Sequence, residues 1–451
     1  MRETGAIILA AGMGTRMNTA LPKVLHLIGG QPMLRHLLDA LQGAGISRQV
    51  VVIGWGAEAV KAALPEVQFV LQEPQLGTGH AVLTARQAFA DFEGELVVLY
   101  GDVPLLRQRT VSAMLAAVSG EASADLTVLG FRTSAPSGYG RMKLGADGGL
   151  ERIIEDRDAT PQEQEIDLCN SGAMAGDAGM IFELLEAVGN TNAKGEYYLT
   201  DIVGLAGERG KRVTVFETQE DEVMGVNSLA ELAAAEAVFQ SRRRNEAMDN
   251  GVTLSDPGSV YFAHDTRIAA GVTIGPNVVF GPGVKIEAGA RIEAFCHLEG
   301  CHIGKNANIG PFARLRPGTR IGATAKIGNF VELKKAVIHQ GAKANHLAYI
   351  GDAEVGEGTN IGAGTITCNY DGVDKHRTEI GKGVLIGSNT ALIAPLKIGD
   401  GAIIGAGSTI SADVEGDALA VERAELRLMK GWAGKFWQRK RAAKKAKETK
   451  D

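Results

Sequence analysis

Two glycines and two cations follow an apolar run near the start of the chain. The stretch AIILAAGMGTRMNTALPKVLH, residues 6–26, contains Gly12, Gly14, Arg16 and Lys23. Backbone N–H groups of such a loop can approach phosphate oxygens, and the two cations can flank a polyphosphate. A dinucleotide-binding fingerprint would need a third glycine where Met17 stands, and no G-K-[ST] follows to make a Walker loop. The loop therefore predicts a phosphate site outside these two motifs.

A carboxylate closes a second apolar run, ELVVLYGD, at Asp102. The carboxyl end of a strand is where a carboxylate is expected to meet a Mg²⁺ ion that it shares with substrate phosphates. Phosphoryl and nucleotidyl transfer need mainly positioning and charge neutralisation, so few protein groups would suffice. A strand-end aspartate or a glycine turn alone is weak evidence, but their combination favours this chemistry.

One histidine lies where a repeat in the second half of the chain is interrupted. His346 belongs to KANHLAYIGD, so we expect it on a loop or corner. Acyl transfer to an amine needs a base, and histidine suits that work near neutral pH. Most lone loop histidines have no catalytic role, so the residue type alone leaves the assignment open.

A competing cluster, CHLEGCH, places Cys296, His297, Cys301 and His302 within seven residues. Zinc prefers such ligands, but the spacing matches no standard finger. The repeat register also spreads these side chains over adjacent sides of the fold with different orientations. We therefore expect no metal at this cluster.

The elements that must position these residues differ between the two halves of the chain. From residue 5 to about 131, apolar strands alternate with amphipathic helices, which predicts a largely parallel sheet flanked by helices. In such sheets ligands bind beyond the carboxyl ends of the strands, so the loops with Gly12, Gly14 and Asp102 should face a common cleft. From about 132 to 226 the pattern is less regular and predicts an elaboration that covers the cleft.

After residue 260, large apolar residues recur every six positions. The series runs through Ile268, Ile274, Phe280, Ile286, Ile292, Leu298, Ile303, Ile309, Leu315, Ile321, Ile327 and Leu333, and resumes at Ile380, Ile386, Leu392, Ile398, Ile404 and Ile410. A triangular β-helix gives this repeat, with one six-residue unit and one inward aliphatic per side. Glycine and asparagine suit its corners, where φ is often positive. The segment TCNYDGVDKHRTE, residues 367–379, is too long for one unit and predicts a loop that projects from the coil.

Two further segments flank the repeats. The stretch SLAELAAAEAVFQSRRRNEAM, residues 228–248, has apolar residues at helical spacing and predicts a linker helix, with the run Arg242–Arg244 on a solvated face or at a helix terminus. We expect one domain at 1–227 and another at 249–451. The basic end, MKGWAGKFWQRKRAAKKAKETKD, carries Trp432, Phe436 and Trp437 as candidate anchors and is expected to be disordered over its last residues.

Composition excludes several classes of protein. The chain has 451 residues and a formal net charge of −6, so we expect no nucleic-acid partner. No apolar run approaches the roughly 20 residues of a membrane span, and no secretory signal precedes the first strand, so we expect a cytoplasmic protein without a membrane partner. The four scattered cysteines, Cys169, Cys296, Cys301 and Cys368, are too few for a disulfide scaffold and fit free thiols.

Four motifs in the first 230 residues, LAAGMGTRM, LPK, LQEPQLGTGHA and YGD, resemble the sugar nucleotidyltransferase family. This resemblance implies that UTP binds along Leu9, Ala10, Ala11 and Gly12, with the catalytic cations Arg16 and Lys23 on its phosphates. It places Gln72, Gly77 and Thr78 at uracil, Tyr100, Gly101 and Asp102 beside the nucleotide, and Gly140, Glu155 and Asn170 at the sugar. Asp102 and Asn227 are the implied Mg²⁺ ligands. Ser171 stands where the family usually carries threonine, which keeps the hydroxyl.

With the repeats, NYDG and RLRPG added, the whole chain resembles the bacterial family that joins N-acetylglucosamine-1-phosphate uridylyltransferase to glucosamine-1-phosphate acetyltransferase. The resemblance implies an α/β Rossmann-like nucleotidyltransferase domain, a linker helix and a left-handed parallel β-helix of hexapeptide repeats. It implies His346 as general base, Arg316 and Lys334 on the sugar phosphate, and Tyr349 and Asn360 on the sugar. Acetyl-CoA would meet Ala363, Asn369, Tyr370, Ser388, Ala406 and Arg423. In the family the projecting loop reaches a neighbouring subunit, which implies a homotrimer.

The implied reactions are acetylation of glucosamine 1-phosphate by acetyl-CoA and then in-line attack of N-acetylglucosamine 1-phosphate on the α-phosphorus of UTP, which releases pyrophosphate. An anionic phosphate needs no general base, in keeping with the N-terminal motifs. The product, UDP-N-acetylglucosamine, would feed peptidoglycan and lipopolysaccharide precursors.

Two alternatives to the bifunctional enzyme stay open. One is a nucleotidyltransferase whose β-helix serves only oligomerisation, and the other is a non-catalytic subunit with inherited domains. His346, Arg316 and Lys334 argue against the first, and the intact cations at the glycine loop argue against the second.

Overall fold

A computed structural model describes residues 3–119, 123–192 and 195–448. The chain divides into two compact units, and we describe each by itself. The first comprises Met1–Asn250 with Tyr261–Thr266, and the second comprises Gly251–Val260 with Arg267–Asp451. The contacts therefore divide near residue 250, and the helix expected as a linker belongs to the first unit.

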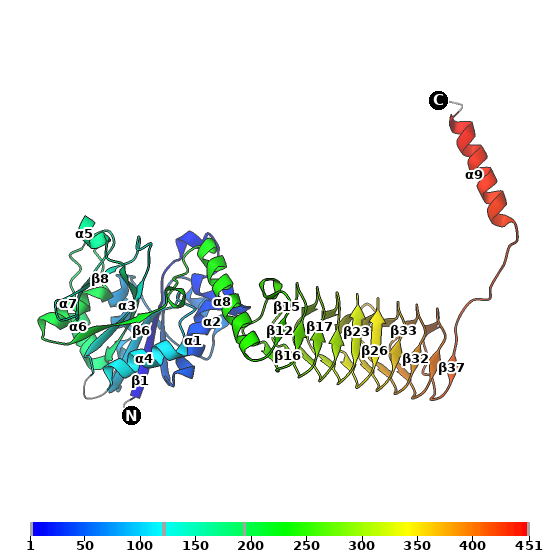
Figure 1. The fold of residues 1–451 in the computed structure, drawn as a ribbon, viewed down its shortest axis with the longest axis horizontal. Coiled ribbons are helices and arrows are strands. Elements are labelled where there is room, and N and C mark those ends of the chain that lie inside the picture. Colours follow the sequence, from blue (N-terminus) through cyan, green and yellow to red (C-terminus); the bar gives the residue numbers. More distant parts are fainter. Residues whose placement is uncertain (1–2, 120–122, 193–194, 449–451) are drawn as a thin grey trace. The chain divides into compact units, whose positions relative to one another are not determined.

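A mixed β-sheet forms the centre of the first unit (Figure 1). Over the described residues its main path runs β11-β7-β10-β6-β1-β4-β5. β6, β1, β4 and β5 are parallel to one another, as expected, whereas β10 is antiparallel to both neighbours. The strands are β1 (Glu3–Ala10), β4 (Arg48–Ile53), β5 (Gln68–Leu71), β6 (Gly94–Tyr100), β7 (Leu126–Arg132), β10 (Leu168–Asp177) and β11 (Val213–Thr218), with β8 (Arg141–Leu144) and β9 (Leu150–Ile154) as a hairpin on β10 and β2 (Leu27–Ile28) paired to β3 (Gln31–Pro32).

Helices and short turns connect these strands. The α-helices are α1 (Met33–Gly43), α2 (Ala57–Ala63), α3 (Thr78–Thr84), α4 (Gln108–Val118), α5 (Pro161–Gln164), α6 (Ala178–Glu186), α7 (Ile202–Glu208) and α8 (Leu229–Asp249). The 3₁₀ turns are η1 (Thr15–Met17), η2 (Lys23–Leu25), η3 (Arg86–Phe89), η4 (Leu199–Asp201) and η5 (Glu220–Glu222). Two clusters of buried apolar side chains hold the sheet and helices together.

A third, smaller core explains the residue that breaks the dinucleotide fingerprint. Met17 is buried and packs in one cluster with Ile28, Met33 and Ala235 of α8. A glycine at this position would remove that contact. The side chain at position 17 therefore anchors the glycine loop to the rest of the unit.

α8 is bound to the first unit along its length. The side chain of Gln240 is buried and exchanges two hydrogen bonds with the backbone of Phe262, at 2.7 and 2.8 Å. Arg243 donates to the carbonyl of Thr266 at 2.7 Å, and Arg242 donates to the carbonyl of Leu105 at 2.7 Å. The expectation that this arginine run lies on a solvated face is therefore wrong for Arg242 and Arg243, because both satisfy backbone carbonyls.

The second unit is a β-helix of stacked short strands (Figure 1). Three parallel sheets form its sides, and the strands of one sheet come from successive coils. The first sheet contains β12 (Thr253–Leu254), β14 (Thr273–Ile274), β17 (Arg291–Ile292), β20 (Asn308–Ile309), β23 (Lys326–Asn329), β26 (Lys343–His346), β29 (Asn360–Ile361), β32 (Leu385–Ile386), β35 (Ile403–Ile404) and β37 (Leu419–Ala420). The turn η6 (Pro257–Ser259) follows its first strand.

The other two sides are built in the same way. The second sheet contains β13 (Arg267–Ile268), β16 (Lys285–Ile286), β19 (Cys301–Ile303), β22 (Thr319–Ile321), β25 (Val337–Ile338), β28 (Ala353–Val355), β31 (Thr378–Ile380) and β34 (Leu396–Ile398). The third contains β15 (Val279–Phe280), β18 (His297–Leu298), β21 (Arg314–Leu315), β24 (Glu332–Lys334), β27 (Tyr349–Gly351), β30 (Ile366–Cys368), β33 (Ala391–Ile393) and β36 (Thr409–Ile410).

The six-residue series predicted from the sequence lines the interior of this β-helix. Every member is buried except Ile268, which lies in the first coil and is half-buried. After the last coil, the basic segment forms α9 (Trp432–Glu448), so the expected disorder is wrong over these residues. Residues 449–451 lie outside the described part. Among the described residues, no helix is long and apolar enough to cross a membrane.

Candidate functional sites

The structure brings Lys23, Asp102 and Asn227 together in the first unit. The ammonium of Lys23 lies 2.5 Å from Oδ2 of Asp102 and 3.0 Å from Oδ1 of Asn227. Both ends of the ion pair are largely buried. The carboxylate follows β6 and the amide precedes α8, so two distant segments supply oxygen atoms to one cation. Oxygen ligands of this kind suit Mg²⁺.

Backbone geometry explains how these groups meet. Gly14 has a positive φ of 59°, and a Cβ there would lie 2.8 Å from Cβ of Lys23. Glycine therefore permits both the turn and the close approach of Lys23. On the other side, the N–H of Val226 donates to the carbonyl of Asp102 at 2.9 Å, which sets Asn227 beside the aspartate.

The remaining nucleotide residues expected at the glycine loop follow β1. Leu9 and Ala10 end that strand, and the N–H of Gly101 donates to the carbonyl of Leu9 at 2.9 Å. The carbonyl of Ala11 accepts a hydrogen bond from the Gln75 side chain at 2.8 Å. Gly12 and Arg16 are exposed, and a Cβ on Gly12 would meet no other atom within 4 Å.

Gln72, Gly77 and Thr78 form a second polar group, between β5 and α3. The amide of buried Gln72 donates to the carbonyl of Gly77 at 3.0 Å and lies 3.1 Å from Nδ1 of His80. Gly77 has a φ of 111°, and a Cβ there would lie 2.6 Å from the carbonyl oxygen of Tyr197. A hydrogen bond therefore joins Gln72 to Gly77, and Thr78 follows directly at a backbone turn that requires glycine.

Tyr100 links the other expected residues of the first unit. Burial raises the pKa of its phenol, which is also hydrogen-bonded to Thr78 and feels the charges of Glu155 and Asp102. The ring packs against Gly172, where a Cβ would lie 2.3 Å from it. Around this ring, the N–H of Asn170 donates to the carbonyl of Gly140 at 2.8 Å, and Thr200 donates to the carboxylate of Glu155 at 3.3 Å.

His346 ends β26 and is exposed at a corner of the β-helix. Its Nδ1 lies 2.6 Å from Oδ1 of Asn329, which pairs with it from the preceding coil. Because the Asn329 oxygen can only accept a hydrogen bond, Nδ1 carries the ring proton. Nε2 then keeps a free lone pair, the form that a general base requires. Sequence reasoning did not identify Asn329, because its role appears only when the coils are stacked.

Three cations converge on the face of the third sheet. Arg316 follows β21, and the register of β21 and β24 sets it in the column of Lys334 on the next coil. The pKa of Lys334 is lowered from its ordinary value, chiefly because Lys375 lies within hydrogen-bond distance and Arg316 adds its charge. A group of like charges on one face suits a phosphate dianion. Lys375 was missed in the sequence because it lies inside the projecting loop.

The two expected sugar-binding residues lie on different sheets. Tyr349 pairs with Glu332, and its hydroxyl lies against Gly351, because a Cβ there would approach that oxygen to 2.5 Å. Gly351 is opposite Lys334, so the phenol extends toward the cations. Asn360 lies instead in the first sheet, opposite Lys343, at the other end of β26 from His346.

Four of the six residues expected at acetyl-CoA, Ala363, Ser388, Ala406 and Arg423, lie along one column on the coils that follow His346. Successive backbone hydrogen bonds at the corner join Gly364 to Leu347, Asn389 to Ala363, and Gly407 to Ser388. This register stacks Ala363, Ser388 and Ala406 on the coils that follow His346, and the side chain of Arg423 reaches Gly407. Small side chains thus leave space beside the column.

The projecting loop covers residues 369–377, between β30 and β31. Asn369 is buried and donates to Asp352 at 2.5 Å, while Tyr370 is exposed and pairs with Lys375. His376 and two backbone N–H groups hold the carboxylate of Asp371 and lower its pKa below the usual range. The loop is therefore internally braced.

The CHLEGCH segment is spread over two sheets. Cys296 and Cys301 are buried free thiols, and burial raises their pKa values to about 11 and about 12. His302 pairs with Glu287 at 2.9 Å. Within the described ranges, no group of three or more His, Cys, Asp or Glu side chains is arranged to hold a metal ion.

Comparisons with known proteins match both halves of the chain. A family model described as a MobA-like NTP transferase domain matches residues 6–153, and one described as bacterial transferase hexapeptide repeats matches residues 265–300, 300–335 and 377–412. A solved structure of UDP-glucose pyrophosphorylase with UDP-glucose covers 54% of the chain at 19% identity, with a TM-score of 0.43, too low to support an argument.

Curated relatives match nearly the whole chain. The protein from Paramagnetospirillum magneticum is 53% identical over 99% of both chains, and the protein from Rhodospirillum rubrum is 54% identical over 97% of this chain and 98% of its own. A relative from Zymomonas mobilis is 49% identical over 97% and 98%. All three are named bifunctional protein GlmU. This chain belongs to the GlmU family of bifunctional proteins.

Proposed function

We propose that this chain makes UDP-N-acetylglucosamine by two reactions in two separate sites. The β-helix unit acetylates glucosamine 1-phosphate, and the N-terminal unit transfers a uridylyl group from UTP to the product. The observation that carries the proposal is that a chain related to bifunctional proteins over nearly its full length gathers, in each unit, cations that its sequence predicts at phosphates.

In the uridylyl transfer, the sugar phosphate attacks the α-phosphorus of UTP, and the bond to the departing pyrophosphate breaks. Arg16 and Lys23 neutralise the triphosphate, so Lys23 exchanges its bonds with Asp102 and Asn227 for bonds with phosphate. Gln72 and the backbone at Gly77 bind uracil, while Asn170, Glu155 and Gly140 orient the sugar. No general base is needed, because the attacking phosphate is already anionic.

Asp102 and Asn227 would hold Mg²⁺. They fit this ion because their oxygens already bind the ammonium of Lys23 as a cation. Bound there, Mg²⁺ would neutralise charge on the phosphates of UTP. Few protein ligands are required, since Mg²⁺ keeps water and phosphate oxygens in its octahedral shell.

In the acetyl transfer, the amine nitrogen of glucosamine 1-phosphate attacks the thioester carbonyl, and Nε2 of His346 takes a proton from that nitrogen as the bond forms. The carbon–sulfur bond then breaks, and the leaving thiolate of coenzyme A takes the proton from His346. Arg316, Lys334 and Lys375 bind the phosphate, and Tyr349 orients the sugar. The column Ala363, Ser388 and Ala406, with Arg423 at its end, binds acetyl-CoA.

A homotrimer in the cytoplasm completes the proposal. Phe295, Phe312 and Phe330 stack on successive coils at centroid distances of 4.9 and 5.0 Å, each 44–55% exposed. Such an exposed apolar ladder is typical of a subunit interface. It runs beside the column of Asn329 and His346, so a neighbouring subunit there could supply Asn360, Asn369 or Tyr370 to the same site. The product would serve peptidoglycan and lipopolysaccharide precursors.

The test uses the purified full chain with glucosamine 1-phosphate, acetyl-CoA, UTP and Mg²⁺. Each component is omitted in turn, and coenzyme A and pyrophosphate are followed separately. His346→Ala should abolish release of coenzyme A and leave pyrophosphate release from UTP and N-acetylglucosamine 1-phosphate intact, and Asp102→Asn should do the reverse. Loss of both activities in both variants would contradict two separate sites.

A further inference from the structure

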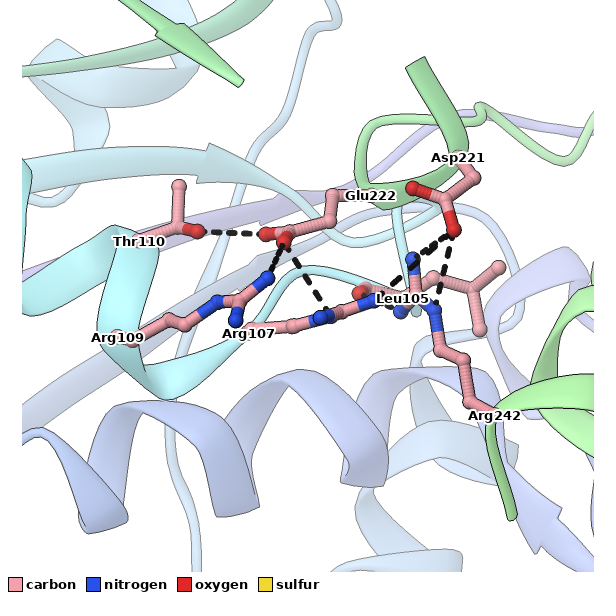
Figure 2. A network of polar contacts seen from close by, with 7 residues as sticks. All are labelled: Leu105, Arg107, Arg109, Thr110, Asp221, Glu222 and Arg242. Carbon is pink, nitrogen blue, oxygen red and sulfur yellow. Dashed lines mark hydrogen bonds and ion pairs between the residues drawn. The ribbon is translucent and has the colours of Figure 1, made fainter. Parts of the chain in front are cut away.

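A network of ion pairs ties together two segments that lie close in sequence to Asp102 and Asn227 (Figure 2). One segment, residues 105–110, begins three positions after Asp102 and enters α4. The other is η5, which ends at Glu222, five positions before Asn227. Each half of the candidate Mg²⁺ site is thus joined to the network by only a few residues of backbone.

The carboxylate of Glu222 is the centre of this network. Its side chain is 1% exposed, and it accepts hydrogen bonds from Thr110 Oγ1 at 2.5 Å and Arg109 Nη2 at 3.1 Å. Arg107 Nε lies 3.2 Å from the same oxygen as Arg109 (Figure 2). Removing one of these partners leaves the buried carboxylate incompletely paired, which is costly.

Asp221 extends the network to α8. Its Oδ2 lies 3.0 Å from Arg242 Nη2 and 4.0 Å from Arg107 Nη2. Arg242 also donates to the carbonyl of Leu105 at 2.7 Å. The pKa of Arg107 is lowered by burial and by the charge of Arg242, so the two carboxylates are needed to hold these guanidinium groups side by side.

We propose that Glu222, held by Thr110 and Arg107, is a positioning residue for uridylyl transfer that sets the distance between the oxygens of Asp102 and Asn227. The hydrogen bond from Val226 to the carbonyl of Asp102 is the direct link, and the network fixes the backbone on both sides of it. The proposal rests on the proposed uridylyltransferase function and adds residues that touch neither nucleotide nor metal.

A chain with a displaced ligand pair should bind the divalent ion more weakly and otherwise behave normally. If the network served only stability, its disruption would instead lower the unfolding temperature without changing the dependence of pyrophosphate release on metal. Measurements of metal dependence and of stability on the same variants therefore separate the two roles.

The experiment compares Thr110→Val with Thr110→Ser. Valine fills the space of threonine but cannot donate to Glu222, whereas serine keeps the hydroxyl. The matched control is Thr127→Val. Thr127 lies on β7, outside the network, is also buried, and accepts a hydrogen bond from Thr214 Oγ1 at 3.2 Å. The readouts are the unfolding temperature, the Mg²⁺ concentration for half-maximal pyrophosphate release and, by electron paramagnetic resonance, the dissociation constant of Mn²⁺ in the presence of UTP.

We expect Thr110→Val to raise both metal constants about fivefold, because only part of the free energy of one hydrogen bond to a buried charge is transmitted to the metal ligands. The metal constants of Thr110→Ser and Thr127→Val should equal those of the parent chain. Acetyl transfer should be unchanged in every variant. Unchanged metal constants in Thr110→Val, or equal changes in Thr127→Val, would overturn the positioning role. A parent chain without any Mg²⁺-dependent pyrophosphate release would instead refute the proposed function itself.

Glu222→Gln provides a second measurement. It keeps the size of the side chain and removes the charge that holds Arg107 and Arg109, so its metal constants should rise at least as far as those of Thr110→Val. A folded Glu222→Gln chain with the metal constants of the parent would also refute the proposal.

Discussion

At the scale of single residues, the proposed acetyltransferase site combines cations that repel one another when no phosphate is present. Arg316, Lys334 and Lys375 lie on one face; Glu332 pairs with Arg316 at 3.0 Å, and Asp352, whose charge acts on Lys334, is bound by Asn369. A dianionic phosphate would relieve this repulsion and favour the protonated form of Lys334. Affinity for the sugar phosphate should therefore depend on the charge of that lysine.

The charge of Lys334 predicts that the affinity for glucosamine 1-phosphate depends on pH. Because the pKa of Lys334 is lowered in the free chain, the ammonium is lost at a lower pH than in an ordinary lysine. Binding of phosphate raises that pKa, so affinity is full below the free-chain pKa and falls as the pH rises through it. Calorimetric titration with glucosamine 1-phosphate between pH 7 and pH 10 should reveal a dissociation constant that increases with pH.

Lys375→Met separates the two contributions of Lys375. Loss of one cation should raise the dissociation constant near neutral pH about tenfold, or about 1.4 kcal/mol. Loss of its repulsion should also raise the pKa of Lys334, so the dissociation constant should begin to increase at a higher pH. Lys382→Met, an exposed lysine in another corner of the β-helix, is the control. A curve for Lys375→Met that superimposes on that of Lys382→Met would contradict the phosphate role.

At the scale of elements, sequence periodicity predicts repeated strands and helices, but it does not predict pairing between strands that are far apart in the sequence. The β-helix followed from the inward series that includes Ile286 and Ile404, because one side chain per side must be apolar. The parallel strands β1, β4, β5 and β6 followed from alternation of strands and helices. The sequence could not predict that β10 lies antiparallel between β6 and β7, because that depends on pairing between segments far apart.

The residues of the candidate sites also divide into those that the sequence predicts and those that it does not. Residues inside short motifs, such as Lys23 and Asp102, were found from their spacing and resemblance, and the structure brings them within hydrogen-bond distance of each other. Asn329, Lys375 and Glu222 were not found, because each acts through a partner on another coil or segment. The assignment of Arg242 to a solvated face failed for the same reason: its acceptor, Leu105, is remote in sequence.

The placement of α8 makes a prediction about shortened chains. A chain that ends at residue 227 loses Ala235 and Phe239, which cover Met17 and Met33, whereas a chain that ends at 266 keeps them together with the Phe262 and Thr266 contacts. Each apolar side chain fully uncovered costs roughly 1.5–3 kcal/mol. We expect the 1–266 chain to keep uridylyl transfer and the 1–227 chain to unfold at lower temperature and lose it.

Calorimetric melting and pyrophosphate release on both shortened chains test this prediction. The full-length chain is the reference for both measurements. Equal activity and stability in the two fragments would demonstrate that α8 is a linker, as the sequence alone suggested, and would leave the Met17 cluster without a functional role.

At the scale of the whole molecule, the same β-helix corner changes character along its length. Below His346 it carries Phe295, Phe312 and Phe330, and above it Gly364 and Gly407. The three phenylalanines have φ values of 56–60°, a conformation that favours glycine, asparagine or aspartate. Large apolar side chains at these corners are therefore unfavourable for the backbone and exposed to water. A partner subunit that buries them would explain both features.

Phe312→Asp tests this account of assembly. Aspartate accepts the left-handed backbone at least as well as phenylalanine, so the coil should fold, while a charge in the middle of the ladder should oppose association. We expect the parent chain to elute as a trimer in light-scattering chromatography and Phe312→Asp to elute as a monomer. Uridylyl transfer should persist, and acetyl transfer should fall at least tenfold, because residues such as Tyr370 would no longer reach a neighbouring His346. Leu144→Asp, which adds the same charge at an exposed apolar position of the first unit, should change neither property. A trimeric Phe312→Asp chain with full acetyl transfer would place the interface elsewhere on the β-helix.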